Sequence, residues 1–222
     1  MANQADIERA TQFVWCNARL IDRYRFAYHF LEADAQPVLD ALRAYQNADG
    51  GFGNALEPDL RSPMSQPQPV EVALHVLDEL DAMNDPMLGR ACDYLRDITT
   101  SDGGVPFVLP MSESYPRAPW WNTGPEPPAS INPTAALAGL LHKHSVAHAW
   151  LGQATEYAWR EIERDAERGG YDFMAIFTFL EHAPDRKRAK KDFDAMAREL
   201  FDGGQLTLDP HAEGHVFMPL QF

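Results

Sequence analysis

Residues 42–53 decide the fold class of this chain. They read Leu42-Arg43-Ala44-Tyr45-Gln46-Asn47-Ala48-Asp49-Gly50-Gly51-Phe52-Gly53. Apolar residues recur at helical spacing up to Tyr45, and two adjacent glycines follow Asp49. Glycine adopts a positive φ without steric penalty, so this pair permits the tight corner that often ends a helix. The stretch therefore predicts the end of one helix and a sharp turn into the next segment.

The same corner recurs along the chain. Its further copies are Asp102-Gly103-Gly104, Gly169-Gly170 and Asp202-Gly203-Gly204. A Pro-rich loop follows each of the first two corners, and Pro69 or Pro133 then opens an apolar helix, as proline favours the first helical turn. Repeated helix pairs bury their apolar faces against neighbouring pairs, in a solenoid or a closed ring. The sequence predicts an all-α fold of helical hairpin repeats forming an α/α toroid, as a single domain over residues 1–222.

Both ends of the chain depart from this repeat. The apolar spacing predicts one long helix from about Ile7 to Leu31, and a second helix after Pro37. After the fourth corner, Gln205 to Phe222 reads as loop with a short extended stretch. We expect either a fragment of a longer protein that lacks its C-terminal hairpin or hairpins, which we favour, or an open ring that a homo-oligomer completes.

Charge and composition narrow the classes of partner. The formal net charge is −14 and the pI is about 4.9, so the surface repels nucleic acid, and none is expected as a partner. The basic run from Arg186 to Lys191 reads as a solvated helix face. The N-terminus is polar, and no apolar run approaches the roughly 20 residues of a membrane span. Two isolated cysteines, Cys16 and Cys92, fit a reducing compartment. We expect a cytoplasmic protein.

The quoted stretch resembles the repeat of the terpenoid cyclase and protein prenyltransferase superfamily. In that repeat a Gln, a spacer and Asp-Gly-Gly-Phe/Trp-Gly link an outer helix to an inner one. The starts of its inner helices match at Pro69 to Leu74 and at Pro133 to Leu141. The run through Glu57-Pro58-Asp59-Leu60-Arg61 looks like a group of uncharacterised bacterial proteins with prenyltransferase-like repeats. The resemblance spans roughly Arg19 to Leu141, and implies an α/α toroid with a central cavity for an apolar or isoprenoid-like small molecule.

The catalytic signatures of that superfamily do not carry over. Its proton-initiated cyclases place Asp-x-Asp-Asp before Thr-Ala, where this chain has Ser130-Ile131-Asn132-Pro133 before Thr134-Ala135. Neither cysteine lies where the zinc ligand of a protein prenyltransferase would be, and an Asp-Asp-x-x-Asp cluster for magnesium diphosphate is missing. The catalytic residues are therefore unknown, and we expect neither a metal nor a cofactor.

Eight residues are candidates for a cavity or substrate-binding site. They are Glu57, Asp59, Arg61, Gln68, Glu71, Trp120, Trp121 and Asn132. The first three lie in the loop that feeds the first inner helix, where two carboxylates could act as acid and base or pair with arginine. Gln68 and Asn132 precede the helix-opening prolines, as N-caps would. The two tryptophans lie in an insertion within Met111 to Ala129, and could line an apolar pocket and stabilise positive charge.

Three functions remain open from the sequence. The first is a prenyltransferase- or cyclase-like toroid that binds an apolar or isoprenoid-like molecule, with its reaction unassigned. The second is a carbohydrate-active enzyme of the glycoside hydrolase or polysaccharide lyase type, with Glu57 and Asp59 or Asp102 as its acids. The third is a non-catalytic interaction scaffold. A centre without a cavity or convergent polar groups would favour this function.

Overall fold

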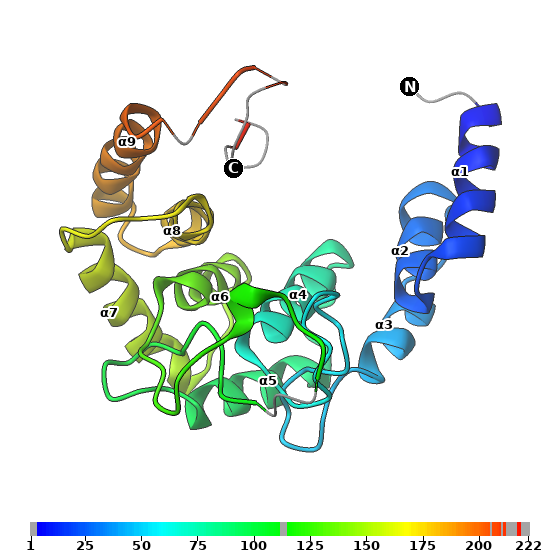
Figure 1. Ribbon diagram of the computed structural model, residues 1–222, viewed down its shortest axis with the longest axis horizontal. Helices are drawn as coiled ribbons and strands as arrows, with labels where there is room; N and C mark the ends of the chain where they lie inside the picture. Colours follow the sequence, from blue (N-terminus) through cyan, green and yellow to red (C-terminus); the bar gives the residue numbers. More distant parts are fainter. Residues whose placement is uncertain (1–3, 112–114, 205, 210, 212–216, 219–222) are drawn as a thin grey trace.

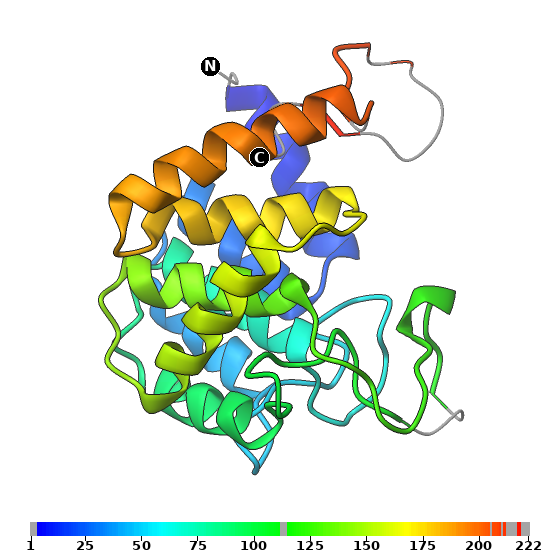
Figure 2. The same ribbon diagram turned by 90° about the vertical axis from the view of Figure 1, so that its left-hand side faces the viewer.

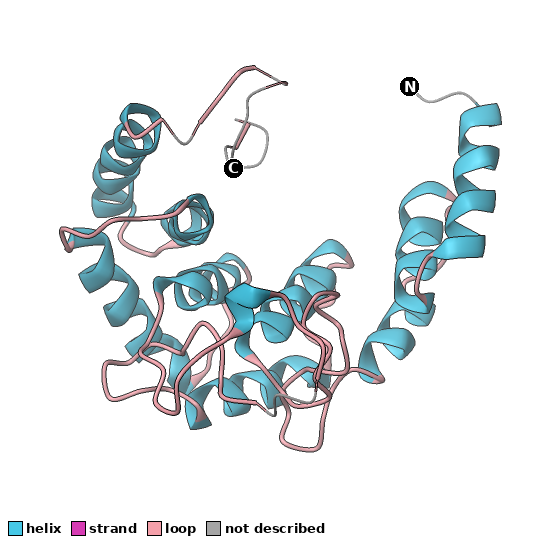
Figure 3. Ribbon diagram, viewed as in Figure 1, coloured by secondary structure: helices cyan, strands magenta, loops and turns pink. Residues whose placement is uncertain are grey.

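The computed structural model describes residues 4–111, 115–204, 206–209, 211 and 217–218. Within these residues the secondary structure is helical, and the β-type contacts are isolated bridges (Figure 3). The α-helices are α1 (Gln4–Asn17), α2 (Leu20–Phe30), α3 (Gln36–Arg43), α4 (Pro67–Glu79), α5 (Pro86–Asp97), α6 (Ile131–Lys143), α7 (Ala149–Glu163), α8 (Gly170–His182) and α9 (Arg186–Asp202). A single 3-10 turn, η1, covers Pro119–Trp121. The predicted all-α class is confirmed for the described residues.

The helices follow one another around an open arc (Figure 1). Helices α4, α6 and α8 lie on its inner side, and α5, α7 and α9 lie on its outer side. Helices α1 to α3 form one arm, and α1 and α9 lie at opposite ends of the arc. The side view shows α8 and α9 stacked above α6 and α7, with long loops gathered at one edge (Figure 2). Those loops are the segments that come after the first two corners.

The first two corners have the same geometry. Gly50 and Gly103 both have φ of +90°, which glycine adopts without strain. The next glycine of each pair faces a tyrosine of the following outer helix. A Cβ on Gly51 would lie 2.9 Å from the Tyr94 ring, and one on Gly104 would lie 2.8 Å from the Tyr157 ring. Each corner therefore needs its second glycine for close packing as well as its first for the turn.

An arginine of the next outer helix fastens each of these corners. Arg90 of α5 donates from Nη2 to the Asn47 carbonyl at 2.8 Å, and Arg160 of α7 donates from Nη2 to the Asp102 carbonyl at 2.5 Å. Hydrogen bonds from a charged donor are among the stronger ones. Consecutive hairpins are thus joined at their corners as well as through their apolar faces.

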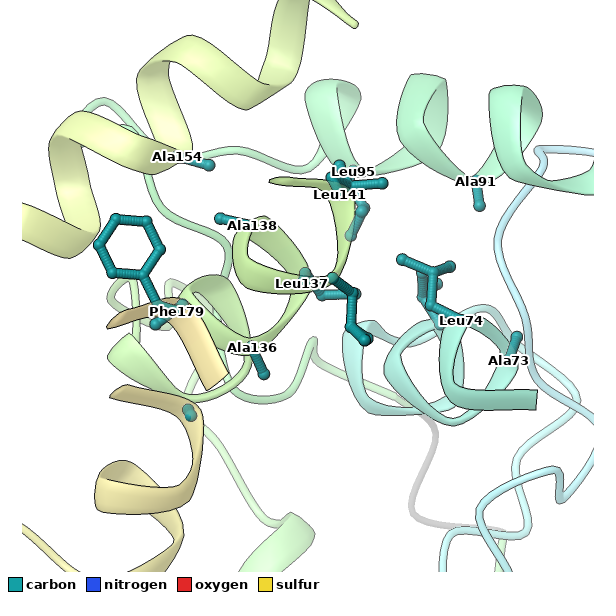
Figure 4. Close-up of a cluster of buried hydrophobic side chains, with 14 of the residues drawn as sticks. Ala73, Leu74, Ala91, Leu95, Ala136, Leu137, Ala138, Leu141, Ala154 and Phe179 are labelled. Carbon is teal, nitrogen blue, oxygen red and sulfur yellow. The ribbon is translucent and has the colours of Figure 1, made fainter. Parts of the chain in front are cut away.

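The core lies between the inner and outer helices. Helix α6 is buried along its length from Pro133 to Leu141, and it packs between α4 and α8. Figure 4 shows Leu74, Leu137 and Leu141 from α4 and α6 close to Leu95 of α5. The backbones of α6 and α8 approach closely enough that a Cβ on Gly139 would lie 2.4 Å from the Thr178 carbonyl oxygen. A side chain larger than hydrogen cannot fit there.

Several predicted boundaries are wrong. The long helix expected from about Ile7 to Leu31 is broken between Asn17 and Leu20, and the described part of α1 has no buried residue. Helix α4 begins at Pro67 instead of Pro69. Of the C-terminal loop predicted over Gln205 to Phe222, only residues 206–209, 211, 217 and 218 are described, and Leu206 pairs with Phe217 there in an isolated β-bridge.

Among the described residues, no helix combines the length and the apolar character that a membrane crossing requires.

Candidate functional site

The loop after the first corner and the loop after the second corner are hydrogen-bonded to each other. The Arg61 amide donates to the Pro116 carbonyl, and the Ala118 amide donates to the Asp59 carbonyl, each at 3.0 Å. Leu60 is buried against Val108 and Trp121 in a small separate apolar cluster. These contacts bring the acidic segment and the Trp-bearing insertion, which are far apart in sequence, to the same place.

A cavity of about 690 Å³ lies where these two loops meet the start of α8. Its lining comprises Glu57, Asp59, Gln68, Phe107, Trp120, Trp121, Ser130, Asn132, Gly169, Gly170, Tyr171 and Asp172. Six of the eight candidate residues are in this lining, and the two others, Arg61 and Glu71, are not. The volume suits a small organic molecule.

Two carboxyl groups and an indole form the acidic side of the cavity. Trp121 donates from Nε1 to Oδ1 of Asp59 at 2.7 Å. Burial of Glu57, together with the neighbouring charge of Asp59 and a hydrogen bond between the two carboxyl groups, raises the pKa of Glu57 to about 7. Arg19 opposes this rise and Glu71 adds to it. Glu57 therefore holds a proton through much of the range below neutral pH, beside an Asp59 that has its own hydrogen-bond donor.

An amide pair forms the wall between the inner helices. Gln68 of α4 donates from Nε2 to Oδ1 of Asn132 at the start of α6, at 3.1 Å. The prediction that Gln68 is an N-cap is wrong, because Gln66 occupies that position. Asn132 has non-helical backbone, with φ of −100° and ψ of 114°, directly before Pro133, as an N-cap of the regular part of α6 would have. Helix α4 therefore begins two residues earlier than the sequence indicated, and Gln68 and Asn132 meet between two successive inner helices.

Aromatic rings supply the apolar part of the lining. Trp121 stacks on Phe107 with ring centroids 5.0 Å apart and planes 10° apart. Trp120 is 61% exposed, and Tyr171 is 56% exposed. The cavity thus has one fixed aromatic pair inside and two accessible rings, an arrangement that can bind the flat face of a ring or an apolar chain.

The start of α8 closes the cavity on the side of the third corner. Asp172 accepts a 2.8 Å hydrogen bond from the Gly169 amide, and burial raises the pKa of this carboxyl. The Phe217 ring packs so tightly on Gly170 that a Cβ there would lie 1.9 Å from it. This wall is therefore held from behind by a residue near the C-terminal end of the chain.

Arg61 and Glu71, the two candidate residues that do not line the cavity, make contacts elsewhere. Arg61 is exposed and bonds to the Pro58 carbonyl from Nε at 3.3 Å. Glu71 lies on α4 with Oε1 3.7 Å from Nε2 of His75, and its other oxygen is buried without a hydrogen-bond partner among the described residues. Asp102, weighed as a possible second acid, is an exposed corner residue that does not line the cavity.

Other polar side chains form contacts within the fold, away from the cavity. Asp49 accepts hydrogen bonds from the Gly51 amide and the Ser65 hydroxyl, which braces the first corner. His144 pairs with Asp78, whereas His148 caps α7. In the basic run, Arg186 donates to carbonyls at the end of α8. Within the described residues, no group of three or more His, Cys, Asp or Glu side chains is placed to hold a metal ion.

Four cavity residues outside the candidate set had partial sequence signals. Phe107 comes shortly after the second corner, and Ser130 precedes Asn132 in the slot before Pro133. Tyr171 and Asp172 come directly after the third corner, in the place that Phe52 and Gly53 hold after the first. A position just after a corner, or just before a helix-opening proline, was therefore the signal that could have identified them.

Comparison with known proteins gives no relative. Neither a protein-family model, nor a curated protein, nor a solved structure matches this chain.

Proposed function

We propose that the cavity binds a small neutral molecule rich in oxygen, of the size of a sugar, and that Glu57 is the acid that protonates one of its oxygens. The observation that supports this most is the raised pKa of Glu57, about 7, in a cavity with aromatic rings and amide groups. A general acid is most effective when its pKa is close to the working pH.

The strength of the acid selects the kind of atom that it can protonate. A carboxyl group with a pKa near 7 donates readily to an oxygen lone pair as the bond to that oxygen breaks. A carbon–carbon double bond is far less basic, so it is a poor proton acceptor for such an acid. The reaction class that fits is acid-assisted cleavage or transfer at an ether, glycosidic or related oxygen.

The polar lining suits hydroxyl groups. Gln68, Asn132 and Ser130 present side chains that both donate and accept hydrogen bonds. Asp172 adds another carboxyl group on the α8 side and is the candidate for the second acid or base of such a reaction. A hydrocarbon ligand would desolvate these groups without replacing their hydrogen bonds, which is costly.

An isoprenoid-like ligand is the second candidate. Trp120, Trp121, Phe107 and Tyr171 give the cavity a large aromatic surface, and the corners resemble those of the terpenoid cyclase and protein prenyltransferase superfamily. We propose a neutral isoprenoid in this case, because the carboxyl groups of Asp59 and Asp172 would repel a diphosphate and the described lining has no cationic side chain.

One series of binding titrations distinguishes the two candidate ligand classes. Intrinsic fluorescence and calorimetry would follow binding of mono- and disaccharides, isoprenoid alcohols and isoprenoid diphosphates. We expect sugars to bind, Trp120→Phe to weaken the fluorescence response, and the distant Trp15→Phe variant to respond as the parent does. Binding of isoprenoid alcohols alone would favour the second candidate. A folded protein that binds no compound of either class would leave the interaction scaffold as the better function.

We further propose that the arc is part of an α/α toroid. Its curvature, the inner and outer helix rows and the repeated corners support this (Figure 1). A homo-oligomer that completes the ring remains an alternative to additional hairpins in one chain. Sedimentation velocity across a concentration range tests it, and a monomer at all concentrations would contradict closure by a second copy.

A further inference from the structure

The acid Glu57 is carried by a short segment in an unusual backbone conformation. Asn54 and Ala55 both have positive φ, at 57° and 61°. For alanine this region is sterically unfavourable, and other contacts must hold it. The Asn54 amide bonds to the Ser62 carbonyl at 3.0 Å, which closes the loop at its base. The part of the loop nearest to Glu57 has a different anchor.

Arg19 is that anchor, and it comes from outside the site. Its Nη1 donates to the carbonyls of Ala55 and Leu56, each at 2.9 Å. Its Nε and Nη2 donate to the two oxygens of Asp22 at 2.7 and 3.2 Å, which fixes the guanidinium in one orientation. Arg19 lies where the predicted long helix breaks, with the extended backbone of an N-cap. The break between α1 and α2 thus places a guanidinium against the two residues before Glu57.

We propose that Arg19 is a positioning residue that holds Glu57 at the cavity through the Ala55 and Leu56 carbonyls. This inference deepens the function proposed above and rests on it for the role of Glu57. The N-terminal arm then contributes to the site although none of its described residues lines the cavity. The alternative is that Arg19 only fastens the arm to the first repeat.

Two effects of removing Arg19 act in opposite directions on Glu57. The charged groups that act on Glu57 are Asp59, Glu71 and Arg19. Loss of the cation alone would raise the pKa of Glu57 further, because Arg19 favours the ionised form. Loss of position would expose Glu57 to water and lower its pKa, because burial is the largest cause of the shift. The direction of the change therefore separates positioning from simple charge.

The test is a ¹³C NMR titration of the Glu57 side-chain carboxyl in the full chain without ligand, assigned by comparison with Glu57→Gln. In the parent protein we expect a midpoint near 7. In Arg19→Met the midpoint should fall toward the ordinary value of 4.5, and Arg19→Lys should lie between the two. An unchanged or raised midpoint in Arg19→Met would overturn the proposal.

Arg90→Met is the matched control. Arg90 also donates to a backbone carbonyl, that of Asn47 in the first corner. We expect Arg90→Met to lower the melting temperature without changing the titration midpoint of Glu57. If Arg90→Met shifted that midpoint as much as Arg19→Met does, the role of Arg19 would be structural only.

If Arg19→Met does not fold, Asp22→Asn is the substitute, because it loosens the guanidinium and keeps its charge. An unchanged midpoint in that variant would overturn the proposal. Because the titration needs no ligand, its outcome is independent of whether sugars bind.

Discussion

The indole Nε1 of Trp121 donates a 2.7 Å hydrogen bond to Oδ1 of Asp59. This bond joins the insertion after the second corner to the loop after the first. It also gives the Asp59 carboxylate a fixed donor next to Glu57, so that the two acids are in different environments. Burial and the neighbouring charge of Asp59 raise the pKa of Glu57, the other acid of this pair.

Trp121→Phe should destabilise the protein by about 1–3 kcal/mol, because Asp59 loses a partly buried hydrogen bond while the contact with Phe107 is largely kept. Urea denaturation measures the change in the free energy of unfolding. Trp120→Phe is the control, since that side chain is 61% exposed, and its effect should stay within about 0.5 kcal/mol. Equal losses in the two variants would contradict the importance of the Trp121–Asp59 bond.

Glu57 should make stability depend on pH. Its pKa is about 7 in the folded protein and near 4.5 when unfolded, so the folded state holds the proton more tightly. The resulting stabilisation is fully present below pH 4.5 and is lost as the pH rises through 7. Relative to Glu57→Gln, the free energy of unfolding of the parent protein should fall by on the order of 1 kcal/mol between these pH limits. This is less than the full pKa shift implies, because Glu57 is only half-buried and solvent screens its interactions.

Thermal or urea unfolding at pH 5 and pH 8 measures this difference. Glu126→Gln removes an exposed carboxyl from the insertion and serves as the control. Parallel pH curves for the parent and Glu57→Gln would show that the environment of Glu57 does not favour its protonated form.

Gly139→Ala should cost about 2–3 kcal/mol, because the added Cβ would lie 2.4 Å from the Thr178 carbonyl and force α6 and α8 apart. Gly152→Ala, in α7, meets open space and should stabilise by about 0.5–1 kcal/mol through helix propensity. Chemical denaturation of the two variants gives the comparison. A neutral Gly139→Ala variant would mean that the two inner helices can separate at little cost.

Thr134→Val should destabilise by about 1–3 kcal/mol. The buried Thr134 hydroxyl oxygen accepts from the Val105 amide at 2.9 Å, and valine of nearly equal volume would leave that amide unpaired. Thr178→Val is the control, because the Thr178 hydroxyl only donates to a carbonyl of its own helix, that of Met174. Similar unfolding midpoints for both variants would argue against Thr134 as the link between the second corner and α6.

The sequence was most informative where a local conformation required a particular residue. Gly50 and Gly103 were readable because their positive φ favours glycine at any such corner. The break at Arg19 could not be predicted, because apolar spacing continues through it and the Arg19 contacts there are with Ala55 and Leu56, which are far away in sequence. The spacing of apolar residues indicates which face of a helix is buried. It does not indicate where a helix is interrupted by an arginine that binds a distant loop.

The candidate site was predictable in part for a similar reason. Glu57, Asp59 and the two tryptophans were identified as unusual groups in loops, and the structure places them in one cavity. Gln68 was identified for the wrong reason, because it lies inside α4, two residues after the N-cap Gln66. The α8 wall was missed because its position depends on how far the arc bends over three hairpins, which local sequence does not encode.

The cavity has walls from three successive hairpins: the Glu57 loop, the Trp121 insertion and the Gly169–Asp172 segment. In a stack of repeats, each hairpin is stabilised mainly by contacts with its nearest neighbours, and the end hairpins can unfold separately. A molecule bound to all three walls would add a contact between hairpins that are not adjacent. Ligand binding would then make the unfolding of the arc more cooperative, so that hydrogen exchange in α4 and in α8 would slow together.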